Sequence, residues 1–542
     1  MGYLLPILVA LGSLALEDFS SVSFPWAVPS LLVVPYAAAF LSRRQELAGR
    51  FRAAGLIDRV SRILPTLMQY LAVGVLGWME SLELWLSTDI SLFVWPKPSL
   101  LLAIAPFVGY TLATIDAEGR WGGLPPGPMK VMRGFQTRMF LSGLGPMVAY
   151  VLLASLVGVN DLLRLGIQEV SLWSFGFSLL VGMGFITLMP LLLRWTWDTE
   201  TLTSGPEFEL MTRVAQMAKF RCREVLVWRT GNMMANAAIV GLFPAGRRVF
   251  LTDALLAQSG PRQLAAVYAH EIGHAKRGHV FLFLVCSLAF FLGFDLLLEW
   301  FAVEQEWIAS TALVVAAGAW MLGFGWLSRR IELDADLFSL ELLRDGIGIT
   351  SALQMIGGAP NRHSWRHFSP QARIDFLESV LQNRELGRSL RRRLRVIFLV
   401  GAAVLGVSGA VRLRSVAGDY PLERAVVDLR LGHYTQAANR LESIVSADAE
   451  DLRELACLAE EESLGDMDSP EQALASVTGL ATKAFEVRDL DRATGWLALA
   501  SYLGDREAGS AARWLMEPDD KSAPTDLGPW QASIEEVLEN SE

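Results

Sequence analysis

Long apolar stretches alternate with short polar segments over most of this chain, a pattern typical of proteins with several membrane spans. A helix of about 20 apolar residues is long enough to cross a hydrocarbon core of about 30 Å. Two stretches of this length, Val280 to Leu298 and Trp307 to Leu327, are separated only by Ala302 to Glu306 and their flanking residues. They predict a transmembrane hairpin that returns the chain to the side of the membrane from which it left.

Seven further apolar stretches bring the expected number of spans to nine. Several are short or contain proline. Their ranges are Tyr3 to Leu16, Trp26 to Leu41, Leu64 to Met79, Leu100 to Ile115, Met139 to Val159, Leu172 to Leu193 and Val396 to Val411. The first stretch has neither a basic segment nor a small-residue cleavage site before Glu17, so we interpret it as a retained span and not as a signal peptide.

Composition agrees with a membrane protein. Hydrophobic residues make up 52% of the chain, the mean hydropathy is +0.35, and tryptophan, which is enriched at bilayer interfaces, occurs 17 times. The net charge of −10 argues against a nucleic-acid partner. The three cysteines, Cys222, Cys286 and Cys457, match neither a disulfide framework nor a metal-binding spacing.

The distribution of arginine predicts which loops face the cytoplasm, because cytoplasmic loops carry an excess of Lys and Arg. The second and fourth loops are rich in these residues, whereas the first and third lean acidic. With nine spans, the segments Arg194 to His279 and Arg329 to Arg395 are expected in the cytoplasm, and the chain after Arg412 outside it. One miscounted span after the first of these segments would reverse the side of the tail.

The run Ala269 to His274 is a HEXXH motif that ends just before the apolar hairpin. Residues four apart share one face of a helix, so His270 and His274 can direct imidazole nitrogens at a single zinc ion, with Glu271 beside them as general base. Pro261 in the first turn and apolar residues at helical spacing predict this helix. The motif indicates hydrolytic chemistry at a membrane surface.

Carboxylates that follow the hairpin offer a third zinc ligand. Glu332 and Asp336 are four residues apart on a predicted helix and share a face, whereas Asp334 points about 200° away from Glu332. We therefore predict Glu332 as the third ligand and Asp336 as a neighbour that orients a ligating imidazole. The alternative is that both carboxylates only solvate a helix beside the preceding arginines.

A third histidine, His279, follows the motif closely. It lies nine residues after His270, which is about 180° around a straight helix, and it misses the spacing of the extended zinc-peptidase pattern. We interpret it as an interfacial histidine and not as a metal ligand.

The HEIGH helix, the hairpin and the E-x-x-A-D run together resemble the HtpX-like and CAAX prenyl protease group of integral-membrane zinc metallopeptidases. Residues 236–241 and 248–256 are similar to the two strands that precede the catalytic helix in this family. The resemblance implies that the strand beginning with Asn236 and Ala237 lies at a sheet edge and pairs with extended substrate.

A downstream segment also resembles the family. Residues 367–374 are similar to its His-Pro-Ser segment followed by Arg-Ile, with Phe368 where proline is usual. Three roles remain open for His367 and Arg373: they steady the oxyanion, pair with Asp336, or form a structural salt bridge.

The chain changes character from about Asp419, where it becomes polar and Ala-rich with a helical pattern. The run Leu431 to Ala437, with Leu441 following at helical spacing, resembles the turn and second helix of a tetratricopeptide repeat. Such repeats bind peptides or partner proteins, so a protein partner for the tail is expected. An ordinary helical bundle without a binding groove is the alternative.

These observations predict a mainly α, polytopic transmembrane protein with a small α+β zinc-peptidase domain of the gluzincin type and a C-terminal helical-repeat-like domain. The expected segments are a multi-span region, a peptidase domain interrupted by the hairpin at about 280–327, a last span and a soluble tail, at residues 1–194, 195–394, 395–412 and 413–542.

The expected function is that of a zinc-dependent endopeptidase with one zinc ion per chain, embedded in a lipid bilayer. It would cleave membrane or membrane-proximal proteins, for processing or quality control, at the cytoplasmic face of a bacterial inner membrane. An intramembrane site-2 type protease is disfavoured because Lys276, Arg277 and His279 make the motif interfacial. A non-catalytic sensor or scaffold that binds partners through the same fold is the alternative outside the enzymes.

Overall fold

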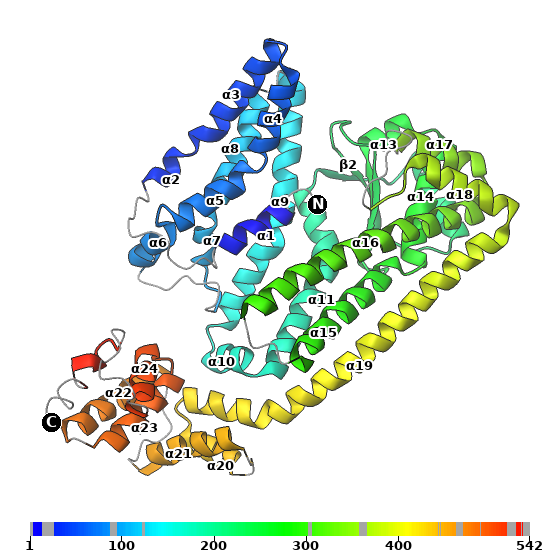
Figure 1. The fold of residues 1–542 in the computed structure, drawn as a ribbon. Coiled ribbons are helices and arrows are strands. Elements are labelled where there is room, and N and C mark those ends of the chain that lie inside the picture. The colour runs from blue at the N-terminus through cyan, green and yellow to red at the C-terminus, as the bar shows by residue number, and fades with distance from the viewer. Residues whose placement is uncertain are drawn as a thin grey trace. The chain divides into compact units, whose positions relative to one another are not determined.

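The computed structural model describes residues 4–13, 26–86, 95–121, 125–301, 306–356, 366–442, 444, 446–461, 470–487, 489–516, 527–532 and 534. The described part is mainly helical and contains one four-stranded sheet (Figure 1). It divides into two compact units. The first comprises Met1–Leu152 and Gly182–Arg412, and the second Leu153–Val181 and Leu413–Glu542.

The N-terminal part of the first unit is a group of helices that pack on one another, with α8 against both α3 and α5. Their bounds are α1 (Leu4–Gly12), α2 (Ala27–Ser30), α3 (Val33–Leu47), α4 (Phe51–Ser61), α5 (Leu64–Gly74), α6 (Trp78–Leu86), α7 (Leu100–Ala103), α8 (Ala105–Trp121) and α9 (Pro126–Val157). The break between α7 and α8 is stabilised by Gln69, a fully buried side chain. Its amide donates to the Ala103 carbonyl and accepts from the Phe107 N–H, each at 3.0 Å, so backbone groups freed by the break are satisfied.

Five of the described helices are long and apolar enough to cross a membrane. They are Gly127–Val157, Ser171–Thr196, His279–Trp300, Thr311–Leu343 and Arg384–Arg430. These helices contain the last five of the nine expected spans. The first four expected spans coincide with shorter helices: α1, for example, has nine residues and rises only about 13 Å, although Tyr3 and residues 14–16 of that expected span lie outside the described part. The count of nine therefore exceeds what helix length supports among the described residues.

The sheet has the strand order β1-β2-β4-β3, with bounds β1 (Thr199–Thr201), β2 (Glu224–Trp228), β3 (Ala237–Val240) and β4 (Arg248–Thr252). Strands β2 and β4 are parallel, while β1 and β3 run antiparallel to their neighbours. All five residues of β4 are buried, as expected for a β-branched and aromatic strand in the middle of a sheet. Strand β3 thus lies at one edge.

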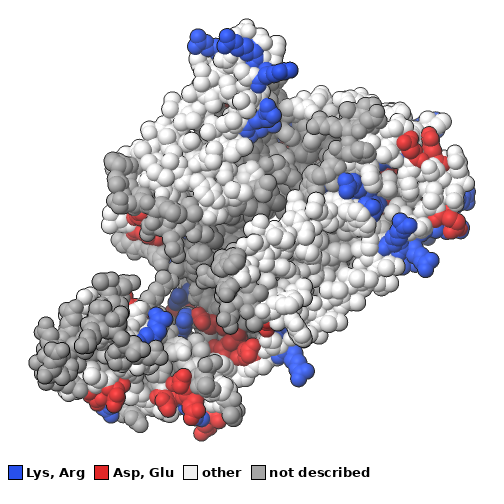
Figure 2. Space-filling view, in the orientation of Figure 1, with Lys and Arg blue, Asp and Glu red and all other residues white. Residues whose placement is uncertain are grey.

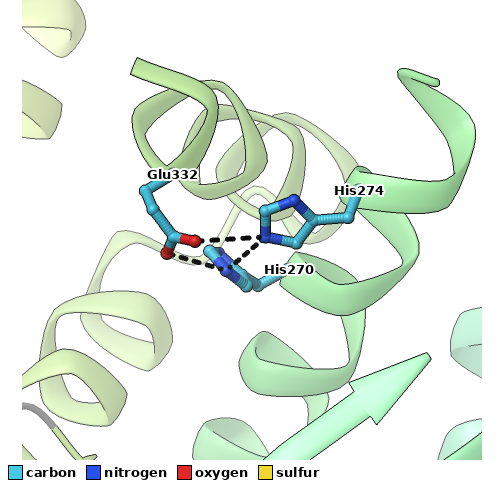
Figure 3. A group of neighbouring side chains, drawn as sticks. All are labelled: His270, His274 and Glu332. Carbon is cyan, nitrogen blue, oxygen red and sulfur yellow. Dashed lines mark hydrogen bonds and ion pairs between the residues drawn. The ribbon is translucent and has the colours of Figure 1, made fainter. Parts of the chain in front are cut away.

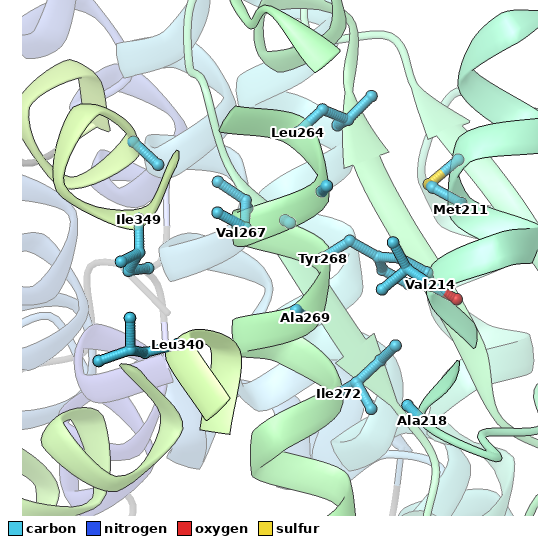
Figure 4. Packing of buried hydrophobic residues seen from close by; sticks show 14 of the residues in the cluster. Met211, Val214, Ala218, Leu264, Val267, Tyr268, Ala269, Ile272, Leu340 and Ile349 are labelled. Carbon is cyan, nitrogen blue, oxygen red and sulfur yellow. The ribbon is translucent and has the colours of Figure 1, made fainter. Parts of the chain in front are cut away.

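Six helices between residues 206 and 382 cover the sheet and enclose the largest apolar core of the first unit. They are α12 (Pro206–Met217), α13 (Asp253–Gln258), α14 (Pro261–Lys276), α16 (Glu306–Leu343), α17 (Gly346–Ile356) and α18 (Pro370–Gln382). Helix α14 runs through the middle of this core, where Leu264, Tyr268 and Ile272 are at most 2% exposed (Figure 4). The side chain of Gln263 accepts a hydrogen bond from the Gly260 N–H at 2.9 Å and fixes the start of α14.

The two long apolar helices α15 (His279–Trp300) and α16 form the predicted hairpin, and α19 (Arg384–Arg430) packs beside them through Leu394, with Leu327 and Ile331 of α16. Gly278, in the left-handed region at φ +70°, separates α14 from α15. Two consecutive helices meeting at this glycine allow His279 to turn back toward the HEXXH motif.

The second unit contains α10 (Asp161–Glu169) and the tail helices α20 (Tyr434–Leu441), α21 (Ala447–Glu461), α22 (Pro470–Glu486), α23 (Leu490–Tyr502) and α24 (Arg506–Met516). Helix α11 (Ser171–Thr196) begins in this unit and ends in the first. Neighbouring tail helices pack around small residues and large buried side chains such as Tyr434 and Trp496. A helical tail agrees with the sequence, while its likeness to tetratricopeptide repeats and the four-segment division of the chain stay predictions.

Candidate metal centre

The HEXXH helix α14 crosses α16 at a point where small residues allow a close approach. A Cβ atom added at Gly273 would lie 3.1 Å from the Cβ of Phe338 and 3.2 Å from the Cα of Ala335. Ser339 of α16 also donates a hydrogen bond to the Ala266 carbonyl of α14 at 2.9 Å. The glycine within HEIGH and the alanine within E-x-x-A-D are therefore the residues that bring the two helices together.

This crossing brings His270, His274 and Glu332 to one point, with the two imidazoles and the carboxylate directed at one another (Figure 3). The Nε2 atoms of His270 and His274 are 3.1 Å apart. Each lies 3.6 Å from one oxygen of Glu332. The three residues predicted as ligands thus form one cluster, in which the ligand atoms all lie within 4.8 Å of one another.

The donor set and its spacing fit a zinc ion. Ligand atoms about 2.1 Å from tetrahedral zinc are separated from each other by about 3.4 Å, close to the three separations in the cluster. Two histidines and one glutamate leave a fourth position for water or substrate, which is the arrangement of catalytic zinc sites. Zinc-binding residues of this cluster would be His270, His274 and Glu332.

Asp336 orients the ring of His270. The Nδ1 atom of His270 lies 2.8 Å from Oδ1 of Asp336, on the far side of the ring from the cluster. Asp336 is fully buried and receives two hydrogen bonds from Arg373, at 2.6 and 2.7 Å. A carboxylate that accepts the Nδ1 proton leaves the Nε2 lone pair of His270 free for a metal ion.

His279 occupies the matching place beside His274, which the sequence did not indicate. Its Nδ1 atom is 2.9 Å from Nδ1 of His274, and its Nε2 atom is 3.2 Å from Oδ2 of the buried Asp334. If His274 donates its Nδ1 proton to His279, and His279 donates its Nε2 proton to Asp334, both rings are neutral and His274 keeps Nε2 free. His279 is therefore outside the three-ligand cluster, as predicted, but it contacts a member of that cluster and is buried.

The pKa values of the two histidines in this side-chain network differ in direction. Burial lowers the pKa of His274, with a smaller contribution from the charge of His270, to about 3. Burial acts in the same direction on His270, but the hydrogen bonds that its ring donates to the carboxylates of Asp336 and Glu332 outweigh burial and raise its pKa to about 10. A metal ion binds neutral imidazole, so its binding would release the proton from His270.

Glu271 lies beside the cluster and points toward the edge strand. Burial raises the pKa of its carboxyl to about 7, and the backbone N–H of Ile239 in β3 donates a hydrogen bond to it. A carboxyl with this pKa exchanges protons readily near neutral pH, which is the property required of a general base. The nearby positive charge of a metal ion would lower the pKa of Glu271 and favour the ionised form.

The predicted edge strand lies at an edge of the sheet. Ala237 pairs with Leu251 of β4, and Asn236 exchanges hydrogen bonds with Thr252 through its N–H and carbonyl. No described strand pairs with the other side of β3. Among the described strands, Asn236 and Ala237 are therefore contacted only by β4. They lie in the same edge segment as Ile239, whose backbone N–H donates a hydrogen bond to Glu271.

His367 and Arg373 both approach the third member of the cluster. The Nδ1 atom of His367 and the Nη2 atom of Arg373 each lie 3.4 Å from Oε2 of Glu332. The side chain of His367 is 46% exposed, whereas that of Arg373 is 13% exposed. Of the roles left open by the sequence, pairing with Asp336 describes the position of Arg373, whereas His367 lies beside Glu332 with its side chain partly exposed.

Comparisons with known proteins agree with this geometry. The family model "Peptidase family M48" matches residues 208–381. The CAAX prenyl protease 1 homolog of Oryza sativa subsp. japonica is 25% identical over 177 residues, which cover 31% of this chain and 41% of that protein. Protease HtpX homolog 1 of Sulfolobus acidocaldarius is 28% identical over 251 residues, which cover 40% of this chain and 73% of that protein.

A solved structure, that of S. mikatae Ste24p, aligns with a TM-score of 0.39 and 15% sequence identity over 66% of this chain and 99% of that chain. The match to the rice relative spans less than half of that protein. The family match concerns the region that contains the His270, His274 and Glu332 cluster, and the long apolar helices are those of a membrane protein. Residues 208–381 are therefore similar to peptidase family M48 and lie in a chain whose described part contains five helices long and apolar enough to cross a membrane, and its relatives include a CAAX prenyl protease homolog and an HtpX homolog.

Proposed function

We propose that the chain is a zinc-dependent endopeptidase that cleaves membrane or membrane-proximal proteins. The observation that carries the proposal is the meeting of three groups at one place: the His270, His274 and Glu332 cluster, the Glu271 carboxyl and the one-sided strand β3. A ligand set alone would fit a structural metal site. A general base and a strand edge beside it are what peptide hydrolysis requires in addition.

Substrate binding would use backbone groups of β3. An extended peptide added to the free edge of β3 forms hydrogen bonds with its main chain, which requires no particular substrate side chains. Because Ile239 of β3 donates to Glu271, such a peptide would pass next to the carboxyl and the cluster. This mode favours unfolded or locally extended segments over folded proteins.

Zinc at the cluster would activate water and polarise the scissile carbonyl. Glu271 would take a proton from the attacking water in this step. In a later step it would pass the proton to the leaving amine. Asp336, held by Arg373, keeps the His270 ring in its orientation, and His279 does the same for His274. His367, exposed and beside Glu332, is placed to donate a hydrogen bond to the developing oxyanion.

The location of cleavage follows from the sequence. Arginine-rich segments on both sides of the hairpin favour the cytoplasmic face, and we propose a bacterial inner membrane as the site. We further propose that the tail recruits a protein partner, since its helices contribute no member of the cluster.

Replacement of Glu271 by Gln tests the proposal. The variant should retain zinc, measured by elemental analysis of purified protein, and should lose casein cleavage by at least about 1000-fold, because an amide cannot accept the proton. Gln263→Glu, on the same helix but at its start, is the control and should cleave normally. Zinc loss in Glu271→Gln would contradict the role of general base. Full zinc content in a parent protein that cleaves nothing would favour a sensor or scaffold.

A further inference from the structure

A groove between α16 and α19 is lined by two arginines, one serine and three apolar side chains. Its lining residues are Trp326, Ser389, Arg392, Arg393, Val396 and Ile397, and its volume is about 440 Å³. We call it the α16–α19 groove. It shares no residue with the His270, His274 and Glu332 cluster.

The groove lies where both helices change from apolar to basic. On α16, the apolar stretch that ends at Leu327 is followed by Arg329 and Arg330. On α19, the basic run Arg391–Arg395 is followed by the exposed apolar residues from Val396 onward. Figure 2 shows basic side chains gathered along the upper part of α19, where the uncharged surface of the long helices ends. Such a transition marks the headgroup level of a bilayer, and an exposed tryptophan is common there.

The positive charges around the groove are not neutralised within the described part of the chain. Arg391 and Arg388 form ion pairs with Glu341 and Glu385. Arg330, Arg392 and Arg393 belong to no ion pair among the described residues. Arg330 stacks on Trp326, with its guanidinium carbon 3.8 Å from the ring centroid, and donates to the Trp326 carbonyl at 2.9 Å.

Repulsion between these arginines makes an anion the expected ligand. Arg392 and Arg393 are neighbours in the sequence, and both line the groove. Like charges brought together at a surface of low polarity are stabilised by a shared counter-ion, and guanidinium groups bind phosphate through paired hydrogen bonds. A soluble phosphate would not account for the apolar half of the groove, where Val396 and Ile397 continue the basic run toward the apolar part of α19.

We propose that the α16–α19 groove binds an anionic phospholipid. Arg392, Arg393 and Arg330 contact the phosphate, and an acyl chain lies along Val396 and Ile397. Charge complementarity and the apolar continuation of the groove select this occupant over a zwitterionic lipid or a free anion. Because Arg330 precedes Glu332 by two residues on α16, the lipid holds the turn of helix that carries one member of the cluster.

Native mass spectrometry of the full-length protein in detergent tests the proposal. Phosphatidylglycerol, phosphatidylcholine and inorganic phosphate are added separately to the parent, to Arg392→Gln/Arg393→Gln and to Arg384→Gln/Arg388→Gln. The last pair removes two exposed arginines of the same helix that do not line the groove. The parent and this control should bind phosphatidylglycerol in preference to phosphatidylcholine, and the groove variant should bind it about 30-fold more weakly, the loss expected for two basic side chains at a membrane surface.

Three outcomes would overturn the proposal. They are equal binding of the two lipids by the parent, equal loss in the groove and control variants, and displacement of phosphatidylglycerol by millimolar inorganic phosphate, which would indicate a soluble-anion site. Arg392→Lys/Arg393→Lys keeps the charges and should retain most of the lipid binding. If size exclusion shows that the Gln variant is misfolded, this Lys variant provides the second test. Lipid binding is read directly, and its result is independent of proteolysis.

Discussion

Two buried aspartates, one in each compact unit, are both paired with arginine, but only one of them also contacts a histidine of the candidate metal site. Asp336 is 0% exposed and paired with Arg373, and Asp428 of the second unit is 1% exposed and paired with Arg424 and Arg440. Asp336 also contacts His270, which belongs to the metal cluster. Asp428 contacts no member of such a cluster among the described residues.

The comparison shows that a buried ion pair alone says little about function. An arginine that compensates the cost of burying a carboxylate serves stability in both units. Asp336 has a second role, because it also orients the imidazole of a candidate metal ligand. Close packing of helices is likewise no sign of a site by itself. The tail helices also pack around small residues such as Ala456 and Ala481, whereas the α14–α16 crossing brings the candidate metal ligands together.

The largest effect should follow from separating the two helices of the metal centre. In Gly273→Val the added side chain meets Phe338 and Ala335 at distances that real Cβ atoms rarely show, so α16 must move and carry Glu332 away from His270 and His274. We expect loss of zinc and a decrease in casein cleavage of at least about 100-fold, since displacements of about 1 Å have such effects.

Gly479→Val in α22 is the matched change in the tail. A Cβ atom at this position has no neighbour within 4 Å. Zinc content and cleavage should therefore equal those of the parent. A Gly273→Val protein that keeps stoichiometric zinc would show that the close crossing is not needed to assemble the cluster.

The next effect compares the two aspartates directly. Asp336→Asn should reduce zinc affinity, measured by competition with a chromophoric chelator, by about 10- to 100-fold, because a neutral amide is a weaker acceptor for the His270 Nδ1 proton and loses the ion pair with Arg373. Asp428→Asn should leave zinc affinity unchanged and lower only the unfolding temperature of the tail, where Arg424 and Arg440 lose their charged partner. Equal zinc affinities in the two variants would remove the distinction between the two aspartates.

A smaller effect is expected on the other side of the cluster. His279→Phe keeps a ring of similar size but cannot hydrogen-bond to His274, so zinc affinity should decrease by about tenfold, less than in Asp336→Asn. The reason is that one oxygen of Asp334, behind His279, has no hydrogen-bond partner in the described part of the chain, whereas both oxygens of Asp336 accept from Arg373. Chelator competition on both variants under one set of conditions gives the ranking, and the reverse order would contradict it.

The sequence predicted the cluster because helical periodicity determines which residues share a face. His270 with His274, and Glu332 with Asp336, needed only the spacing of four. The buried contact of His279 with His274 was not predicted, because a single straight helix was assumed, whereas α14 ends at Lys276 and Gly278 at φ +70° begins a new direction. The role of Gly273 depends on which helix packs against it, and the sequence pattern around Gly273 does not predict that partner.

The number of spans shows the same limit. Hydropathy identified each of the five long apolar helices found among the described residues, because length and composition are properties of the local sequence. It did not predict the breaks in the N-terminal region, where Gln69 of α5 satisfies the backbone between α7 and α8. Such breaks depend on a side chain more than 30 residues away in the chain.

The smallest effect should follow from removing the tail. A chain ending after Arg414 keeps every residue of the cluster and of the core around α14, so it should bind zinc and cleave casein within about twofold of the parent. A chain ending after Met516 keeps α19 to α24 and is the control. The shorter chain exposes Leu165 and Val170, which pack against Val427 and Leu431, so extraction in detergent is monitored alongside zinc content. If casein cleavage were lost while zinc binding and membrane integration stayed intact, the tail would be part of the catalytic apparatus. The second unit would then contribute to catalysis and not only to packing.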